Sequence, residues 1–357
     1  MEIVRGELTY EKQDRIGVGQ GLNSEVYRAR EIGMNRTVAV KEIAKADLSV
    51  RGIYDFFREA RMLFQARHHH VAEIFTAVET AELVSLVMPL YERGSLASRI
   101  AQGPLSLNSA LRIAHEVLLG LGVVHMRNMV HFDLKPTNVL FAPNGRAMVA
   151  DFGQTRMLND MGVAEEPAMY PYAIPPEVER FHAATSAADI WQMGLLLYRA
   201  LNGDPFYCAI KAEQLEKAGS AAACRRSGKI VDLDHFQPHV PLSLRKIIKR
   251  AMAFDPANRF ESAEQFSDVL GRVIVALDWQ MTSAGTELFW RAEPRGRTPL
   301  VVQVEQAPQN RRNIRVYTDG LKGLRAHGKD KMWADGLTVK QTAEHLRLRV
   351  FTPLGRK

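Results

Sequence analysis

Three polar side chains within six residues could carry a chemical reaction. Asp133, Lys135 and Asn138 lie in the stretch HFDLKPTNVL, which covers residues 131–140. A carboxylate can accept the proton of an attacking hydroxyl, an ammonium can neutralise a moving phosphate, and an amide oxygen can bind Mg²⁺. These residue types together suit phosphoryl transfer. By itself, however, Asp-Leu-Lys-Pro more often marks a plain turn.

A glycine-rich turn and a strand with one cation lie near the start of the chain. Two short strands are predicted around a turn that contains Gly19, Gly21 and Ser24, where backbone N–H groups could approach phosphates. The following segment TVAVKEI predicts a β-branched strand that carries Lys41. Alone, such a turn is more often structural and such a lysine is more often solvated, so both interpretations depend on the rest of the chain.

The order of the motifs closely resembles that of the eukaryotic-type serine/threonine protein kinases, whose catalytic loop reads His-Arg-Asp-Leu-Lys-Pro-x-Asn. A glycine-rich turn, a strand lysine, a helix glutamate, this loop, Asp-Phe-Gly and Pro-Pro-Glu follow one another at near-family distances over about residues 10–280. The resemblance implies an α+β, bilobal kinase domain over residues 10–282. Its small β-rich N-terminal lobe would cover about residues 10–90 and its large helical C-terminal lobe about residues 91–282.

The resemblance also implies ATP and Mg²⁺ as cofactors and a role for each matching residue. Asp133 would take the substrate proton and Lys135 would stabilise phosphate charge, while Asn138 and Asp151 would hold Mg²⁺. ATP would be bound by the glycine-rich turn, the strand lysine with its helix partner, the hinge and the apolar residues around adenine: Gly19, Gly21, Ser24, Val26, Ala39, Lys41, Glu59, Met88, Leu90, Tyr91 and Leu140. Without the other motifs, an exposed helix glutamate and ordinary core packing would explain Glu59 and the apolar residues.

Other matching residues would hold the fold or bear on regulation. Glu177 of Pro-Pro-Glu should pair with Arg259, and Asp189 should brace the catalytic loop. Phe132 stands where many regulated kinases have arginine, and this difference bears on regulation. Tyr170 stands where a threonine usually contacts the catalytic residues, and this difference bears on the choice between serine or threonine and tyrosine as acceptor.

Two alternatives to a protein kinase remain open. A pseudokinase that serves as a nucleotide-binding scaffold is disfavoured because every catalytic polar residue is present. A kinase-fold enzyme that acts on a small molecule is disfavoured because the activation segment, residues 151–177, and the large helical lobe are typical of protein kinases. The triple histidine at 68–70 is not assigned as a metal site, since consecutive residues on one turn rarely converge on one ion.

Length and composition bound the remaining possibilities. A chain of 357 residues can bury a large core and form more than one folding unit. The two cysteines, Cys208 and Cys224, lack the paired spacing of a disulfide framework or a zinc site. We find no signal-peptide pattern at the start and no run of about 18 apolar residues, so we expect a cytoplasmic protein and no membrane partner.

The net charge of +7 is concentrated at the end of the chain. Residues 291–357 hold 15 Lys and Arg against six Asp and Glu, a net charge of +9. We expect a linker over residues 283–299 and a basic α+β appendage over 300–357. Its predicted elements are strands at 300–304, 314–317 and 346–350 and a helix at 338–345. The basic surface could simply be solvated, could dock an acidic protein partner or, less favoured, could bind nucleic acid.

Overall fold

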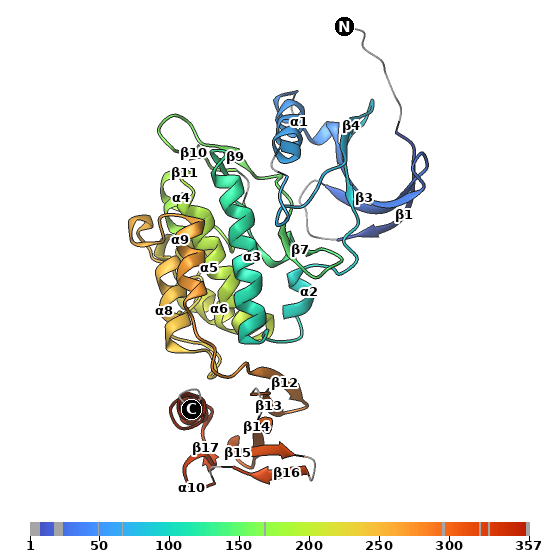
Figure 1. Ribbon diagram of the computed structural model, residues 1–357. Coiled ribbons are helices and arrows are strands. Elements are labelled where there is room, and N and C mark those ends of the chain that lie inside the picture. The colour runs from blue at the N-terminus through green and yellow to red at the C-terminus, as the bar shows by residue number, and fades with distance from the viewer. Residues whose placement is uncertain are drawn as a thin grey trace.

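The computed structural model describes residues 8–17, 24–48, 50–65, 67–167, 169–294, 297–320, 323–327 and 329–354. A β-rich N-terminal lobe, a helical C-terminal lobe and a C-terminal appendage follow one another along the long axis of the molecule (Figure 1). The expected bilobal α+β architecture is confirmed, and the reactive loop lies at the junction of the two lobes.

The described part of the N-terminal lobe is a five-stranded antiparallel sheet with a helix beside it. Alternate residues of one strand, Val38 and Val40, are fully buried with Ala29 and Val87, as expected for a pleated strand. The helix packs Phe56 onto the larger core that both lobes share. The elements are β1 (Tyr10–Ile16), β2 (Glu25–Glu31), β3 (Arg36–Ala44), η1 (Lys45–Asp47), α1 (Val50–Gln65), β4 (Thr76–Glu79) and β5 (Leu83–Pro89), in the sheet order β1-β2-β3-β5-β4.

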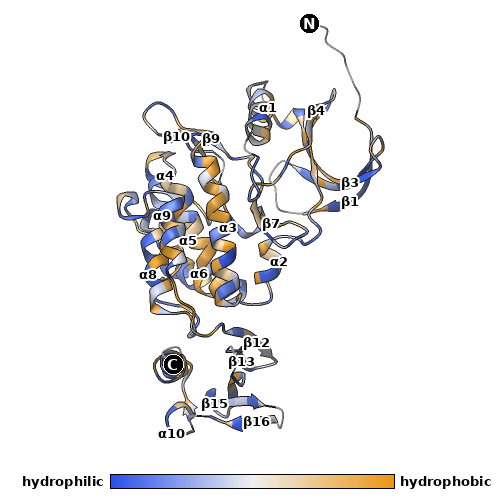
Figure 2. Cartoon of the chain, viewed as in Figure 1, coloured by the Kyte–Doolittle hydropathy of each residue, from blue (hydrophilic) through white to orange (hydrophobic). Residues whose placement is uncertain are grey.

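Helices make up most of the C-terminal lobe, and hydrophobic residues run along them (Figure 2). They are α2 (Leu96–Ile100), α3 (Leu107–His125), α4 (Pro176–Phe181), α5 (Ala187–Asn202), α6 (Asp204–Ala218), α7 (Ala221–Ser227), α8 (Leu242–Ala251) and α9 (Ala263–Gly271). Short two-stranded pairs and 3₁₀ turns lie in the loops between them: β6 (Met129–Val130) with β9 (Arg156–Met157), η2 (Pro136–Asn138), β7 (Val139–Phe141) with β8 (Ala147–Val149), β10 (Ala164–Glu165) with β11 (Ala183–Ala184), and η3 (Pro256–Asn258).

The longest helix of this lobe, α3, is the scaffold for the reactive loop. Ser106 caps its first turn by accepting from Ser109 N, and residues such as Val117 and Leu121 are fully buried at helical spacing. Among the described helices, α3 alone is long and apolar enough to cross a membrane, but most of it is buried in the lobe. It packs against α5, α9 and β8, which marks it as a core helix.

The appendage is a sheet covered by a short helical segment. Trp290, Val302 and Val316 from the strands are buried against Val350 and Phe351 of the helical segment. Its described elements are β12 (Gln280–Ala284), β13 (Glu287–Ala292), β14 (Leu300–Ala307), β15 (Arg311–Gly320), β16 (Gly323–Ala326), α10 (Lys329–Met332), β17 (Ala334–Leu337), α11 (Val339–His345), the π-helical turn η4 (Leu346–Phe351) and α12 (Thr352–Leu354). The strands follow the order β12-β13-β14-β15-β16, with β17 also paired to β15.

Two of the sequence predictions for the appendage are wrong. Residues 283–299 are not a linker, because β12 and β13 are strands of the appendage sheet and Trp290 and Ala292 alternate inward around the exposed Arg291. Residues 346–350 are helical rather than extended. Leu346 and Val350 are buried four residues apart, as on a helix, whereas Leu348 is exposed. The strands predicted at 300–304 and 314–317 and the helix at 338–345 are confirmed.

A buried ion pair anchors the end of the activation segment to the C-terminal lobe. Both guanidinium Nη atoms of Arg259 donate to the carboxylate of Glu177, at 2.7 and 2.6 Å. The arginine side chain is inaccessible to solvent and also donates to the carbonyl oxygens of Ala253 and Ala187. The pairing expected from the sequence is therefore present.

We predict that Arg259→Met will destabilise the protein by about 3–5 kcal/mol, because it leaves the Glu177 carboxylate without its partner in a largely buried site. Urea denaturation of the full chain measures this change. The matched control is Lys217→Met, which breaks the exposed pair with Glu213 and should leave stability nearly unchanged. Equal losses in the two variants would contradict the role given to the buried pair.

Candidate active site

The reactive loop brings its three predicted polar residues together at one carboxylate. Lys135 Nζ donates to Asp133 Oδ2 at 2.7 Å, and Asn138 Nδ2 donates to the same oxygen at 2.9 Å and to the Asp133 carbonyl oxygen at 2.8 Å. The Asp133 side chain is buried, and its other oxygen, Oδ1, has no hydrogen-bond partner among the described residues. The arrangement therefore leaves one carboxylate oxygen available to accept a proton.

A second carboxylate fixes this loop from within the C-terminal lobe. Asp189 at the start of α5 is fully buried and accepts from the backbone N–H groups of His131 and Phe132, at 2.8 and 2.9 Å. It also bonds His125 Nε2 at 2.8 Å. Burial works to raise the pKa of Asp189, but the hydrogen bonds from His125 and the backbone outweigh it, so the pKa lies below its ordinary value.

Gln192 is a further brace of the loop that the sequence analysis missed. Its Oε1 accepts from Leu134 N at 2.8 Å, and its Nε2 donates to the carbonyl oxygens of Phe132 and Ala173, at 2.8 and 2.9 Å. Because Ala173 belongs to the activation segment, this one amide ties that segment to the loop. The available signal was its position three residues after Asp189, on the same face of a helix.

Lys41 and Asp151 meet across the junction between the lobes. Lys41 Nζ donates to Asp151 Oδ1, so the strand of one lobe and the Asp-Phe-Gly turn of the other are joined by an ion pair. Burial works to raise the pKa of Asp151, but the charge and hydrogen bond of Lys41, helped by Lys135 and His131, lower it to about 2. Asp151 therefore stays ionised over the physiological pH range.

Asn138 and Asp151 offer neighbouring oxygen ligands. Ala150 N donates to the Asn138 carbonyl oxygen at 2.8 Å, which places the two segments side by side. The amide nitrogen of Asn138 is used by Asp133, so its amide oxygen is the atom left to bind an ion; among the described residues that oxygen contacts only Thr137 Oγ1, at 3.3 Å. A carboxylate and an amide oxygen are hard ligands, and this donor set fits Mg²⁺.

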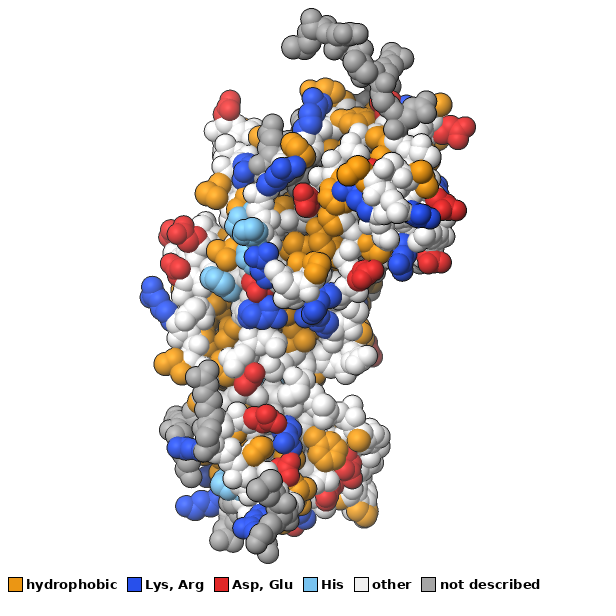
Figure 3. Space-filling view, turned by 45° about the vertical axis from the view of Figure 1, so that its right-hand side comes forward, with side chains coloured by type: hydrophobic (Ala, Val, Ile, Leu, Met, Phe, Trp, Pro, Cys, Tyr) orange, Lys and Arg blue, Asp and Glu red, His pale blue; other side chains and the backbone are white. Residues whose placement is uncertain are grey.

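The residues predicted around adenine line the same junction. In the sheet register Val26 lies opposite Lys41 and Ala39 lies opposite Met88, so both pairs belong to neighbouring strands. Leu140 lies in β7 below them. Figure 3 shows hydrophobic side chains gathered between the two lobes, with Lys and Arg side chains nearby.

The hinge and the phosphate-binding turn are described only in part. Leu90 and Tyr91 follow β5 directly, and the Tyr91 hydroxyl accepts from Glu73 N at 3.0 Å, which fixes the hinge to the segment before β4. Ser24 is half-buried just before β2. Gly19 and Gly21 lie outside the described residues, and so does the side chain of Glu59, whose backbone belongs to α1. Their assigned roles stay predictions.

Phe132 holds the loop and the activation segment together through apolar contacts. It is fully buried although its φ is +64°, a conformation that bulky residues rarely adopt. It packs in a cluster with Met169 and Ile174 of the activation segment and Val178 of α4. Where an arginine would present a charge, this chain therefore places a hydrophobic contact.

Tyr170 lies beside Lys135 of the reactive loop. Lys135 Nζ is 5.5 Å from the centroid of its ring, and the Tyr172 ring contacts it edge to face. Burial raises the pKa of the Tyr170 hydroxyl, although 40% of the residue remains exposed. The tyrosine thus lies next to the loop, as its sequence position predicted, with its ring facing Lys135 Nζ.

Comparison with known proteins identifies relatives of this chain. The profile of the protein kinase domain matches residues 10–269. Serine/threonine-protein kinase PrkC of Bacillus subtilis (strain 168) is 30% identical over 253 residues, which are 69% of this chain and 38% of that protein. Serine/threonine-protein kinase pkn2 of Myxococcus xanthus is 28% identical over 298 residues, 79% of this chain and 35% of that protein. CBL-interacting protein kinase 16 of Oryza sativa subsp. japonica is 30% identical over 254 residues, 69% of this chain and 53% of that protein.

The chain thus spans between about a third and a half of the length of these relatives. The matched profile ends before the appendage begins. The profile match therefore bears on the two lobes, which contain the loop, the Asp-Phe-Gly turn and the strand lysine.

The ion pair at the junction predicts a pH dependence. The contribution of Asp151 to stability is present above about pH 4 and fades as the pH falls toward 2, because its folded-state pKa is depressed below the unfolded value. In Lys41→Met the largest lowering influence is lost while the opposing effect of burial remains, so the Asp151 pKa should rise well above about 2. Carboxyl-carbon NMR shifts of ¹³C-Asp-labelled protein, followed down to about pH 4, measure the difference. An Asp151 resonance that titrates alike in both proteins would contradict the assignment.

Proposed function

The chain belongs to the protein kinase family, and we propose that it transfers the γ-phosphate of ATP to serine and threonine hydroxyls of a protein in the presence of Mg²⁺. The observation that carries the proposal is the unpartnered Oδ1 of Asp133, held in place by Lys135 and Asn138 on the other oxygen. A buried carboxylate with one free oxygen beside a fixed ammonium is the arrangement that hydroxyl phosphorylation needs.

Each residue of the loop then has a separate task. Asp133 Oδ1 accepts the hydrogen bond of the acceptor hydroxyl and orients its oxygen. It takes the proton as that oxygen bonds the γ-phosphorus and the bond from this phosphorus to the β-phosphate oxygen breaks, which releases ADP. Lys135 stabilises the negative charge on the transferred group, and Lys41 contacts the phosphates that stay behind. Asn138 and Asp151 would hold Mg²⁺, which when bound neutralises phosphate charge. Asn138 has a second role, because its amide nitrogen fixes Asp133.

A protein substrate is supported by the way the activation segment is built. The segment is tied to the catalytic loop by Gln192 and to the lobe by the Glu177–Arg259 pair, so it forms a fixed surface beside Asp133. The curated relatives named above are serine/threonine kinases by name. Two alternatives were a pseudokinase and an enzyme that acts on a small molecule. Neither explains why Asp133 keeps a free oxygen and a full set of polar neighbours, and neither explains the fixed surface of the activation segment.

We also propose that the activation segment needs no phosphate to hold its shape. In kinases with arginine before the catalytic aspartate, a phosphate neutralises that cation and orders the segment. Here Phe132 is uncharged and packs directly on Met169 and Ile174. One candidate acceptor, Thr155, is itself buried.

For the appendage we propose docking of an acidic protein partner. Some of its cations are used internally, since Arg291 pairs with Asp319 and Arg315 pairs with Asp335. Others are exposed and form no ion pair among the described residues. Two of the exposed cations are Arg311, which donates to the carbonyl oxygen of Gly336, and Lys340 at the start of α11. Such a surface would speed the encounter with an acidic partner and would act less at high salt.

One prediction tests the proposed phosphoryl transfer. Asp133→Ala and Asp151→Ala should each lower transfer of radiolabelled phosphate by at least about 100-fold, the first because the general base is lost and the second because a Mg²⁺ ligand is lost. Asp133→Ala should still bind ATP, because proton acceptance and metal binding are separate tasks. Asp268→Ala, an exposed change on α9, is the control. Phosphorylation that survives both active-site changes would rule out the kinase assignment.

Another prediction concerns regulation by phosphorylation of the activation segment. Protein freed of phosphate by a phosphatase should keep its rate within about tenfold, equivalent to about 1.4 kcal/mol of barrier. Thr155→Val and Tyr172→Phe should likewise leave the rate within that range, and Tyr170 should be dispensable as a phosphate acceptor. A larger loss after phosphatase treatment, restored by rephosphorylation, would show that the apolar cluster does not replace a phosphate.

A further prediction concerns docking of an acidic partner on the appendage. The double variant Arg311→Ser/Lys340→Ser should phosphorylate a peptide with a polyglutamate tail more slowly than the unaltered chain does at low salt. The two proteins should act alike on the same peptide without the tail, and the difference should shrink as salt increases. Equal rates on the tailed peptide would contradict docking. If the variant instead binds RNA or DNA more weakly with unchanged peptide rates, nucleic acid takes the place of the acidic partner.

A further inference from the structure

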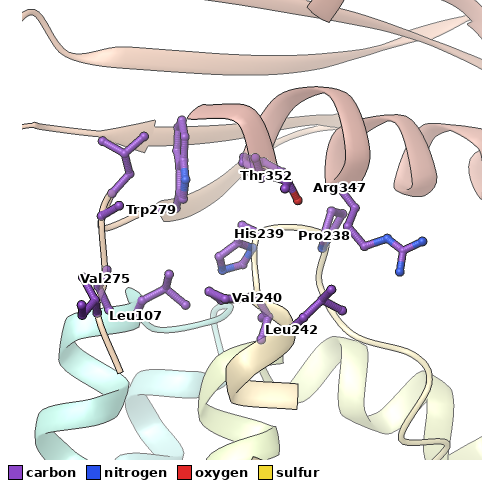
Figure 4. A pocket seen from close by; sticks show the side chains of 14 residues that line it. Leu107, Pro238, His239, Val240, Leu242, Val275, Trp279, Arg347 and Thr352 are labelled. Atoms are coloured by element: carbon purple, nitrogen blue, oxygen red, sulfur yellow. The ribbon is translucent and has the colours of Figure 1, made fainter. Parts of the chain in front are cut away.

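A cavity of about 280 Å³ lies between the C-terminal lobe and the appendage. Figure 4 shows Leu107, Val240 and Val275 on the side of the lobe and Trp279 and Thr352 on the side of the appendage. Most of its wall is hydrophobic. A preformed apolar space between two folded parts, with few polar groups in its wall, is the usual form of a site for a small ligand.

One buried polar group in this wall lacks a partner. His239 is 3% exposed, and its Nδ1 accepts from Trp290 Nε1 at 3.1 Å. An indole nitrogen can only donate, so the ring carries its proton on Nε2. That N–H has no acceptor among the described residues. A buried donor without an acceptor is unfavourable, and a ligand oxygen would satisfy it.

The histidine also stays neutral. Burial and the nearby Arg245 cation lower the pKa of His239 to about 3, so over the physiological range it offers an N–H and no charge. Arg245 fixes the loop that carries it by donating to the carbonyl oxygens of Val240 and Gln237, at 2.9 and 3.2 Å. The donor is therefore held in position before any ligand arrives.

A cation lines the same cavity from the appendage. Arg347 reaches down from the helical segment beside Pro238 and Leu242 (Figure 4). Burial is the main cause that lowers the pKa of Arg245, and the positive charge of Arg347 lowers it further. The two guanidinium groups therefore repel each other. Within the part of the chain that the structure describes, neither forms an ion pair with a carboxylate. The site thus combines excess positive charge, one N–H donor and apolar walls.

We propose that this cavity binds a small carboxylic acid with an apolar body. One carboxylate oxygen accepts from His239 Nε2, the charge is neutralised by Arg347, and the hydrocarbon part lies against Leu107, Val275 and Trp279. The ligand would touch both the lobe and the appendage and would strengthen their contact. The proposal does not rest on kinase activity, because neither Asp133 nor Asp151 takes part.

Octanoate titrated into the full chain by isothermal calorimetry tests the proposal, with 1-octanol as the probe that lacks the carboxylate. We expect octanoate to bind with a dissociation constant below about 1 mM and to raise the melting temperature. Arg347→Gln should weaken octanoate at least about tenfold, and Arg349→Gln, an exposed arginine two residues further on, should leave it unchanged. Thr352→Trp, an enlargement of an exposed side chain that lines the cavity, should abolish binding.

Three results would overturn the proposal. The first is no binding of octanoate at concentrations about ten times the expected constant. The second is an equal loss in Arg347→Gln and Arg349→Gln, which would mean attraction by general positive charge. The third is unchanged affinity in Thr352→Trp, which would place the ligand elsewhere. Since each readout is binding, failure here would leave the proposed phosphoryl transfer untouched.

Discussion

The burial of one carboxylate, that of Asp189, is the constraint on which the geometry of the active site depends. A carboxylate removed from water costs free energy unless its oxygens accept hydrogen bonds. Asp189 therefore requires the backbone N–H groups of His131 and Phe132 to converge on it, with His125 as a further donor. These hydrogen bonds hold Phe132 at a positive φ, and this backbone conformation sets the direction in which the following residue, Asp133, lies.

The same constraint reaches the activation segment. Because the backbone is pinned at residues 131 and 132, the Phe132 ring enters the cluster with Met169 and Ile174. Gln192, one turn along the same helix as Asp189, bonds both the loop and the carbonyl oxygen of Ala173. One helix face thus positions the carboxylate proposed to accept the proton and the surface on which a protein acceptor would lie. In this account order in the segment comes from packing and requires no added charge.

Sequence analysis correctly predicted the parts of the molecule that short local motifs specify. The reactive loop and the Asp-Phe-Gly turn are short motifs, and the Glu177–Arg259 pair follows from two such motifs, so all three could be predicted from the resemblance of these motifs to those of protein kinases. Gln192 was missed because its role depends on backbone groups far away in the sequence. Residues 346–350 alternate like a strand, and only the packing of Leu346 and Val350 against the sheet makes them helical. The cavity around His239 joins segments from four regions of the chain, and no local pattern marks it.

The most direct test of this account is the rate of phosphoryl transfer in Asp189→Asn. The substitution keeps the shape of the side chain but directs an amide N–H toward groups that are themselves donors. The account predicts a fall in kcat of at least about 100-fold with ATP affinity changed less than about threefold, because Asp189 touches the loop and not the nucleotide site. An unchanged kcat in a folded variant would contradict the claim that this buried carboxylate sets the geometry of the active site.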